Sequence, residues 1–268
     1  MTYLKTFRLF GILIATSFII KSCAVDRVEK LDDLEPQYAN RAKVNVFLTD
    51  SPAAYDAVYI DIIQVEIHSD SAGWQSLNPI NAGVYNLLDF SNGMDTLLGS
   101  VSLPQGKISQ IRLILGPNNG ILVDSVYHSL TIPSSAQSGL KLNIHDTLLL
   151  GMTYNIWIDF DAGRSVIKTG NGNYKLKPVI RTFTDATSGT IKGVISPDTA
   201  AYSVMAILGV DTSATMADST GSFMIMGLAA GTYSVFFNNV NTYNDTTVNP
   251  VNVSVGVITD MGSITMTK

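Results

Sequence analysis

The sequence is poor in the residues that build covalent cross-links and metal centres. It contains one cysteine and three histidines in 268 residues. A single cysteine excludes a disulfide framework and any multi-cysteine metal site within one chain. Three histidines leave little material for a zinc site. A length of 268 residues is nevertheless ample for one large or two ordinary domains with a hydrophobic core.

Charged residues are also scarce. They make up 15% of the chain, against 46% for hydrophobic residues. A disordered chain has the reverse balance, so most of this sequence is expected to fold. The net charge of −5 argues against a nucleic-acid binder, which needs a basic face.

Catalytic signatures are missing as well. The sequence has no GxSxG elbow, no HExxH helix and no GxxxxGK[ST] phosphate loop. His68, His128 or His145 could be combined with a serine and an aspartate into a Ser–His–Asp triad, as a histidine could in almost any chain. A triad is recognised only by the geometry of its three side chains, so the sequence gives no evidence for one. We therefore expect a protein that is not an enzyme.

The N-terminus carries an export signal. Lys5 and Arg8 precede an apolar run over residues 10–20, which is too short to span a bilayer and fits the core of a signal peptide. Cys23 follows at once, in Ile20-Lys21-Ser22-Cys23. This order resembles a bacterial lipobox, although Lys21 departs from the commonest pattern, and it implies lipidation of Cys23.

We expect residues 1–22 to be a lipoprotein signal peptide and residues 23–42 a polar tether. Removing residues 1–22 removes basic residues and no acid, so the mature chain becomes more acidic. The predicted membrane contact is made through the N-terminal lipid. The predicted location is the cell envelope, lipid-anchored in the outer membrane, with surface exposure and a periplasmic face both left open.

Short alternating runs separated by Gly, Pro, Asn and Ser follow from residue 43, and they predict an all-β chain of two β-sandwich-type domains. In the first domain, 43–185, the run over 57–68 changes parity near Ile62-Ile63, which predicts a β-bulge. A turn is expected over 49–52. A short helical turn is expected within 87–98.

Several segments of this domain resemble the domain of unknown function DUF4382. They are, in order, residues 47–52, 58–68 with Trp74, 85–88, 135–141, 159–166 and 174–180. The family implies an extracytoplasmic β-rich domain, commonly on lipoproteins. It implies no established activity.

Three acids of the first domain are candidate metal ligands. Asp159 and Asp161 are spaced i, i+2, so they share one face of a strand, and Asp50 belongs to another matching segment. Three carboxylates with carbonyl oxygens suit Ca²⁺. The alternative is structural: Asp159 or Asp161 pairs with Arg164, Lys175 or Lys177, and Asp50 caps its own turn.

Trp74 and Trp157 are candidate ligand-binding residues. Either ring can stack on a sugar or a partner protein. Core packing is the alternative role for both side chains.

Residues 188–268 carry a second ordered signature, residues 217–225 followed by 227–235. It resembles the carboxypeptidase regulatory-like domain, which implies a seven-stranded prealbumin-like sandwich with a carbohydrate-binding-like fold. Gly221 is expected to take a positive φ in a hairpin turn. Phe223, Ile225, Tyr233 and Val235 are expected in the core.

These observations favour a non-enzymatic cell-envelope lipoprotein that binds or scaffolds through its two β domains. The expected ligand is a glycan or an envelope protein partner, with no nucleic acid and no cofactor other than Ca²⁺. The alternatives are a surface-polymer hydrolase and a structural adhesin or fibre subunit. A terminal strand over 257–266 would favour the fibre subunit if it were exposed and unguarded.

Overall fold

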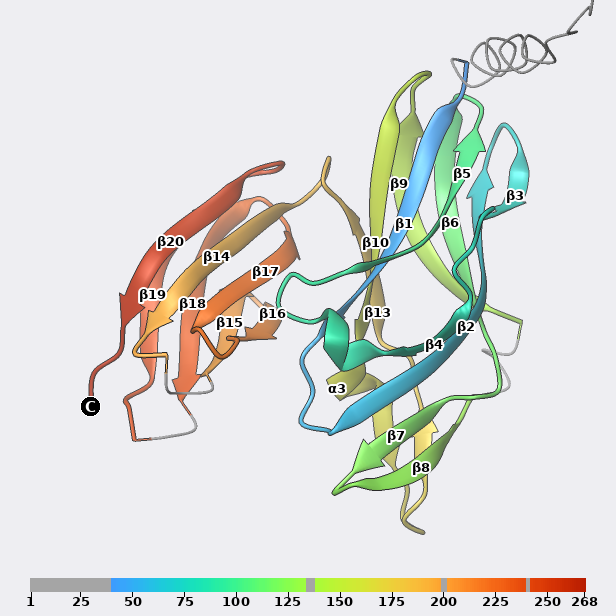
Figure 1. Cartoon of the computed structure of the whole chain (residues 1–268). Helices are drawn as coiled ribbons and strands as arrows, with labels where there is room; N and C mark the ends of the chain where they lie inside the picture. Colours follow the sequence, from blue (N-terminus) through green and yellow to red (C-terminus); the bar gives the residue numbers. More distant parts are fainter. Residues whose placement is uncertain (1–39, 134–137, 199–201, 240–241) are drawn as a thin grey trace, which may run out of the picture. The chain divides into compact units, whose positions relative to one another are not determined.

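The computed structural model describes residues 40–133, 138–198, 202–239 and 242–268. The predicted signal peptide, Cys23 and the predicted tether up to residue 39 lie outside the described residues. Nearly all regular structure is β-strand (Figure 1), which confirms the predicted all-β class. In the ranges that the structure describes, no helix has the length and apolarity that crossing a bilayer requires.

The first half of the fold consists of two sheets. The smaller sheet has the order β13–β10–β1–β5, formed by Ile180–Thr184, Thr153–Asp161, Ala42–Ser51 and Thr96–Leu103. The larger sheet has the order β11–β12–β8–β7–β2–β6–β9, formed by Val166–Lys168, Tyr174–Leu176, Val126–Thr131, Gly120–Val123, Ala57–Ser69, Gly106–Leu115 and Leu140–Leu148. Four shorter elements complete it: β3 (Gly73–Ser76), β4 (Gly83–Asn86), the 3₁₀ helix η1 (Leu87–Phe90) and α3 (Ala162–Ser165).

Strand β1 shows why these residues form a sheet with one buried face. Its side chains alternate, so that Ala42, Val44, Val46 and Leu48 are fully buried while the intervening side chains point to the other face. β1 pairs with β10 in parallel and with β5 in antiparallel orientation. The carboxyl ends of β1 and β10 therefore meet at the same edge of the sheet.

The local predictions for this half have mixed outcomes. The bulge is confirmed, because the register of β2 against β6 shifts between Ile62 and Gln64. The helical turn expected within 87–98 is confirmed as η1. The end of that range, from Thr96, belongs to strand β5 instead. The expected turn over 49–52 is wrong, because β1 continues to Ser51.

The described residues between 189 and 265 form seven strands in two further sheets, as expected for the second sandwich. One sheet has the order β17–β14–β20, formed by Ser222–Leu228, Gly189–Ser196 and Ile258–Thr265. The other has the order β16–β15–β18–β19, formed by Asp211–Met216, Tyr202–Leu208, Gly231–Asn239 and Thr246–Val253.

The core of this second sandwich contains the four side chains that the sequence predicted to be buried. Phe223, Ile225, Tyr233 and Val235 are all buried. Gly221 has a φ of +79° in the turn before β17. Its cluster of buried residues is separate from the cluster inside the first two sheets.

Candidate functional site

The three predicted metal ligands lie together at the carboxyl ends of β1 and β10. Thr49 pairs with Asp159, and Ser51 pairs with Asp161, so Asp50 lies between the two acids in register. Parallel pairing of two strands that are about 110 residues apart in sequence brings the acids to one edge. The predicted convergence is therefore present, and the partners of each carboxylate decide what it does.

Asp159 is held in an ion pair with Arg181. Arg181 Nε lies 2.6 Å from Asp159 Oδ2, and the hydroxyl of Ser51 donates to Asp159 Oδ1 over 3.3 Å. The same guanidinium donates to Ser213 Oγ and to the carbonyl of Gly227. The partner of Asp159 is thus Arg181, and neither Lys175 nor Lys177, which the sequence suggested.

Asp161 caps the N-terminus of α3, the short helix that follows β10. Its Oδ1 accepts from the backbone N–H of Arg164 over 2.9 Å, which is an N-cap of α3. The Arg164 guanidinium is also 3.7 Å from Oδ2, as one structural alternative expected, but that side chain is 73% exposed. Burial raises the pKa of Asp161, and the hydrogen bond from Arg164 opposes this shift.

Asp50 is buried, as Asp159 is, with 6% of its surface exposed. Its Oδ1 accepts from the N–H of Ala162 over 2.9 Å, so it holds α3 rather than its own turn. Burial raises the pKa of Asp50 to about 9, the hydrogen bond from Ala162 opposes the shift, and the charges of Asp159 and Asp161 add to it. Asp50 is therefore a neutral carboxylic acid at pH 7.

This arrangement favours the structural role of the acids over the predicted Ca²⁺ site. Each of Asp50, Asp159 and Asp161 already accepts a hydrogen bond from a donor of the protein. Within the described ranges, no group of three His, Cys, Asp or Glu side chains is arranged to hold a metal ion.

The two tryptophans have neighbours on their ring faces. The guanidinium of Arg112 lies 4.0 Å from the centre of the Trp74 ring, and His68 meets the same ring edge-on at 5.1 Å. Trp157 is stacked between Phe47 and Phe183, at 5.4 and 5.5 Å between ring centres, and its Nε1 donates to Asp95. A sugar platform needs an uncovered ring face, so the geometry favours packing for Trp157.

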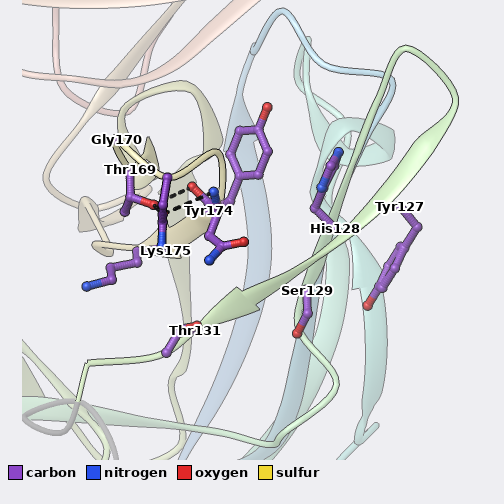
Figure 2. Close-up of a pocket in the computed structure, with 10 residues that line it drawn as sticks. Tyr127, His128, Ser129, Thr131, Thr169, Gly170, Tyr174 and Lys175 are labelled. Carbon is purple, nitrogen blue, oxygen red and sulfur yellow. Dashed lines mark hydrogen bonds between the residues drawn. The ribbon is translucent and has the colours of Figure 1, made fainter.

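A pocket of about 670 Å³ lies elsewhere in the first half, between β8 and the hairpin of β11 and β12. Figure 2 shows Tyr127, His128 and Ser129 on one side, and Thr169, Gly170 and Lys175 on the other with Thr131 below them. Three ring-bearing side chains line it: Tyr127, His128 and Tyr174. Six further polar side chains line it: Ser129, Thr131, Thr169, Asn171, Asn173 and Lys175. The size suits a small ligand or part of a polymer.

The β7–β8 hairpin carries Tyr127, which lines this pocket. Asp124 and Ser125 both have positive φ, which gives a tight two-residue turn whose twist suits a hairpin. Gly120 leaves room for the phenol, because a Cβ there would lie 2.2 Å from the Tyr127 hydroxyl. Tyr127 is 55% exposed, and its ring centre lies 6.5 Å from that of Tyr59.

The opposite wall is a turn built by its own polar side chains. Thr169 Oγ1 donates to Asn171 Oδ1 and to the carbonyl of Asn173, which fixes the loop between β11 and β12. The side chain of Asn173 makes no hydrogen bond to the described part of the chain, and it faces the pocket. Its amide can donate to and accept from a ligand.

The charge of the pocket differs in sign from that of the chain. Lys175 lines it, and Lys168 Nζ lies 5.7 Å from the centre of the Tyr174 ring. No Asp or Glu is among its lining residues within the described ranges. A neutral or anionic ligand therefore fits this pocket better than a cation does.

The sequence interpretation did not find this pocket. Its two walls are about 40 residues apart in sequence, and parallel pairing of Tyr174 with Leu130 brings them together. The local signal was the segment Thr169-Gly170-Asn171-Gly172-Asn173, whose amide and hydroxyl groups are unusually dense. Cys23 lies outside the described residues, so its predicted lipidation stays a prediction.

The comparisons with known proteins assign the first half to a family. The family model described as "Domain of unknown function (DUF4382)" matches residues 41–178, just over half of the chain, which confirms the predicted resemblance. The resemblance of residues 188–268 to the carboxypeptidase regulatory-like domain stays a prediction. The search of curated proteins gives no match.

Solved structures give distant likenesses. A type II cohesin–X-dockerin complex from Acetivibrio cellulolyticus is 27% identical at a TM-score of 0.25, over 29% of this chain and 56% of that chain. A fimbrial protein from Bacteroides ovatus ATCC 8483 is 10% identical at a TM-score of 0.25, and the match covers 85% of this chain and 50% of that chain. The shaft pilin SpaA from Lactobacillus rhamnosus GG is 11% identical at a TM-score of 0.21, and the match covers 85% of this chain and 97% of that chain. The match thus spans little more than half of the cohesin–dockerin chain, and TM-scores this low say nothing about binding or assembly.

Proposed function

We propose that this chain, which belongs to the DUF4382 family, is a non-enzymatic cell-envelope lipoprotein that binds a glycan in the pocket between β8 and the β11–β12 hairpin. The observation that carries the proposal is the composition of that pocket. An exposed aromatic ring, hydroxyls, amides and one ammonium group surround a single hollow of about 670 Å³.

A sugar has the complementary chemistry. One face of a pyranose ring is a patch of C–H groups that packs on an aromatic ring such as Tyr127. Its hydroxyls pair with groups that both donate and accept, as Asn173 and Thr131 do. Lys175 adds a donor for a ring oxygen, a hydroxyl or an acidic substituent.

Binding without cleavage is the proposal because the pocket lacks the groups for hydrolysis. Glycoside hydrolases use a pair of carboxyl groups on either side of the bond that breaks. The described lining residues include no carboxylate. The location at the envelope is supported by the order of basic region, apolar core, small residue and Cys23.

An array of bacterial capsular and lipopolysaccharide oligosaccharides tests this proposal. Wild-type protein and Tyr127→Ala are applied at equal concentration, and Val126→Ala serves as the control because that neighbouring side chain is equally exposed, at 55%. We expect wild type and V126A to bind the same subset of glycans and Y127A to lose at least about ten-fold in signal. The proposal fails if no glycan binds wild type above background.

A second candidate function, a fibre or adhesin subunit, is favoured by one strand. Among the described strands, β20 pairs only with β14, so it forms an edge of its sheet. Ile258 is 57% exposed, and the strand contains one charged residue, Asp260. Such an edge offers unpaired backbone groups to another strand. Sedimentation that shows assembly with rising concentration, abolished in Ile258→Lys, would support this candidate over a monomeric glycan binder.

A further inference from the structure

The turn between β9 and β10 exposes apolar side chains where turns are ordinarily polar. Leu149, Leu150 and Met152 are 52%, 45% and 54% exposed. Gly151 has a φ of +72°, and the N–H of Met152 donates to the carbonyl of Leu149, so the turn has a fixed conformation. These three exposed apolar side chains lie within four consecutive residues, and we call this patch the Leu149–Met152 turn.

This turn is bonded to the point where the chain enters the fold. The N–H of Gly151 donates to the carbonyl of Arg41 over 3.1 Å, and the N–H of Lys43 donates to the carbonyl of Met152 over 2.9 Å. Figure 1 shows the start of β1, the β5–β6 turn and the β9–β10 turn at the same end of the two sheets. The patch thus lies at the end of the fold nearest to Cys23 along the chain.

Three basic residues lie at the same end as the patch, and the guanidinium of one of them, Arg41, donates to the carbonyl of Ser102. Arg41, Lys43 and Lys107 are exposed at this end, and Lys107 pairs in register with Thr147 beside the turn. The acids at this end, Asp70 and Asp146, accept hydrogen bonds from the backbone N–H groups of Lys107 and Thr147. In an acidic chain, this end combines apolar side chains with a local excess of basic ones.

We infer that the Leu149–Met152 turn rests in the headgroup region of the lipid bilayer, with Arg41, Lys43 and Lys107 facing the lipid phosphates. The inference rests on the proposed lipidation of Cys23. Arg41 follows Cys23 by 18 residues, a length of chain that reaches at most about 60 Å. An anchor at that distance keeps this end of the fold near the membrane at high effective concentration.

The chemistry of the patch matches the bilayer interface. Three half-exposed apolar side chains are too small an area to hold a protein on a membrane alone, but they add to an acyl anchor. Basic side chains next to the apolar turn are attracted electrostatically to the anionic lipid phosphates when they lie within a Debye length of them. The expected result is a preferred orientation, with the turn toward the membrane.

Fluorescence of the lipidated full chain in vesicles tests the inference. Leu150→Cys is labelled with the environment-sensitive dye NBD and reconstituted in phosphatidylethanolamine–phosphatidylglycerol vesicles with or without nitroxide-labelled lipid. Val210→Cys is the control, because Val210 is 99% exposed in the turn between β15 and β16. We expect the nitroxide to quench the dye at 150 by about two-fold or more and to leave the dye at 210 unchanged.

Equal quenching at both positions, or none at 150, overturns the inference. A blue shift at 150 without quenching assigns the turn to a contact between two copies of the chain and also overturns it. Failure of the lipidation proposal gives a different signal. Wild-type protein then reacts with the dye at Cys23, the only native thiol, and does not float with the vesicles.

Discussion

Asp159 and Arg181 lie directly opposite each other on β10 and β13, and their side chains approach to 2.6 Å between Oδ2 and Nε. The carboxylate is 5% exposed, and the guanidinium is 41% exposed. Arg181 also reaches β16 and β17 through Ser213 Oγ and the carbonyls of Met226 and Gly227. One side chain thus neutralises a buried acid of the first half and hydrogen-bonds the second sandwich.

Replacing Arg181 with alanine is expected to lower the free energy of unfolding by about 3 kcal/mol, because it leaves the buried Asp159 charge unpaired. Urea unfolding measures this change. Arg164→Ala is the matched control: its guanidinium is mostly exposed and 3.7 Å from Asp161, so a change within about 0.5 kcal/mol is expected. Equal effects of R181A and R164A would contradict the ion-pair assignment.

Asp50→Asn is expected to change the pH dependence of stability. The folded chain holds the Asp50 proton up to about pH 9, whereas the unfolded chain releases it near pH 4. Between these values unfolding releases a proton, so the free energy of unfolding falls as pH rises, by about 1.4 kcal/mol per pH unit. Asparagine keeps an acceptor for Ala162 and removes the proton.

Urea unfolding at pH 5, 6.5 and 8 checks this prediction. D50N should be more stable than wild type at pH 8, and its advantage should shrink toward pH 5. Asp124→Asn, at an exposed turn position with positive φ, should follow the wild-type profile. A D50N profile parallel to wild type would mean that Asp50 is ionised in the folded chain.

Calcium is expected to leave the unfolding temperature of the protein unchanged. Arg181, the N–H of Arg164 and the N–H of Ala162 already engage the three acids. Differential scanning calorimetry with excess Ca²⁺ and with EGTA compares the two conditions. A rise in Tm with Ca²⁺ that disappears in Asp161→Asn would restore the metal site, because a ligand of the folded state raises stability by RT ln(1 + [L]/Kd).

Gly221→Ala is expected to destabilise the second sandwich more than Gly209→Ala does. Both glycines have positive φ, but a Cβ at 221 would lie 2.3 Å from the carbonyl oxygen of Ile195, while none of the described atoms lies within 4 Å of one at 209. G209A is expected to cost about 1–2 kcal/mol for the left-handed conformation alone. G221A adds the clash, and thermal unfolding should report the larger loss.

Local pattern predicted much of this fold, because inward and outward side chains alternate along each strand. It identified the long strand β2 with its bulge near Ile62 and the buried side chains Phe223 and Tyr233. It did not predict β5, since Leu97 and Leu98 also fit a helical turn. Two adjacent apolar residues in a short segment fit both the helical period and the alternation of a strand, so they do not distinguish a helix from a strand.

The sites depended on register, which local pattern does not contain. The sequence grouped Asp50, Asp159 and Asp161 from their strand positions, but Arg181 became the partner of Asp159 only through antiparallel pairing of β10 and β13. Likewise, the pocket required β8 and β12 to pair in parallel across some 40 residues. Long-range pairing of this kind follows from the packing of the whole domain.

The most direct test of the account is the affinity of the pocket for the strongest glycan found on the array, measured by isothermal titration calorimetry. Lys175 lines the pocket, whereas Lys177, also exposed two residues further along the chain, does not. The account predicts that Lys175→Ala weakens binding by about ten-fold, roughly the worth of one charged hydrogen bond, while Lys177→Ala binds as wild type does. Equal affinity of wild type and K175A, with Y127A also unchanged, would contradict a glycan site in this pocket.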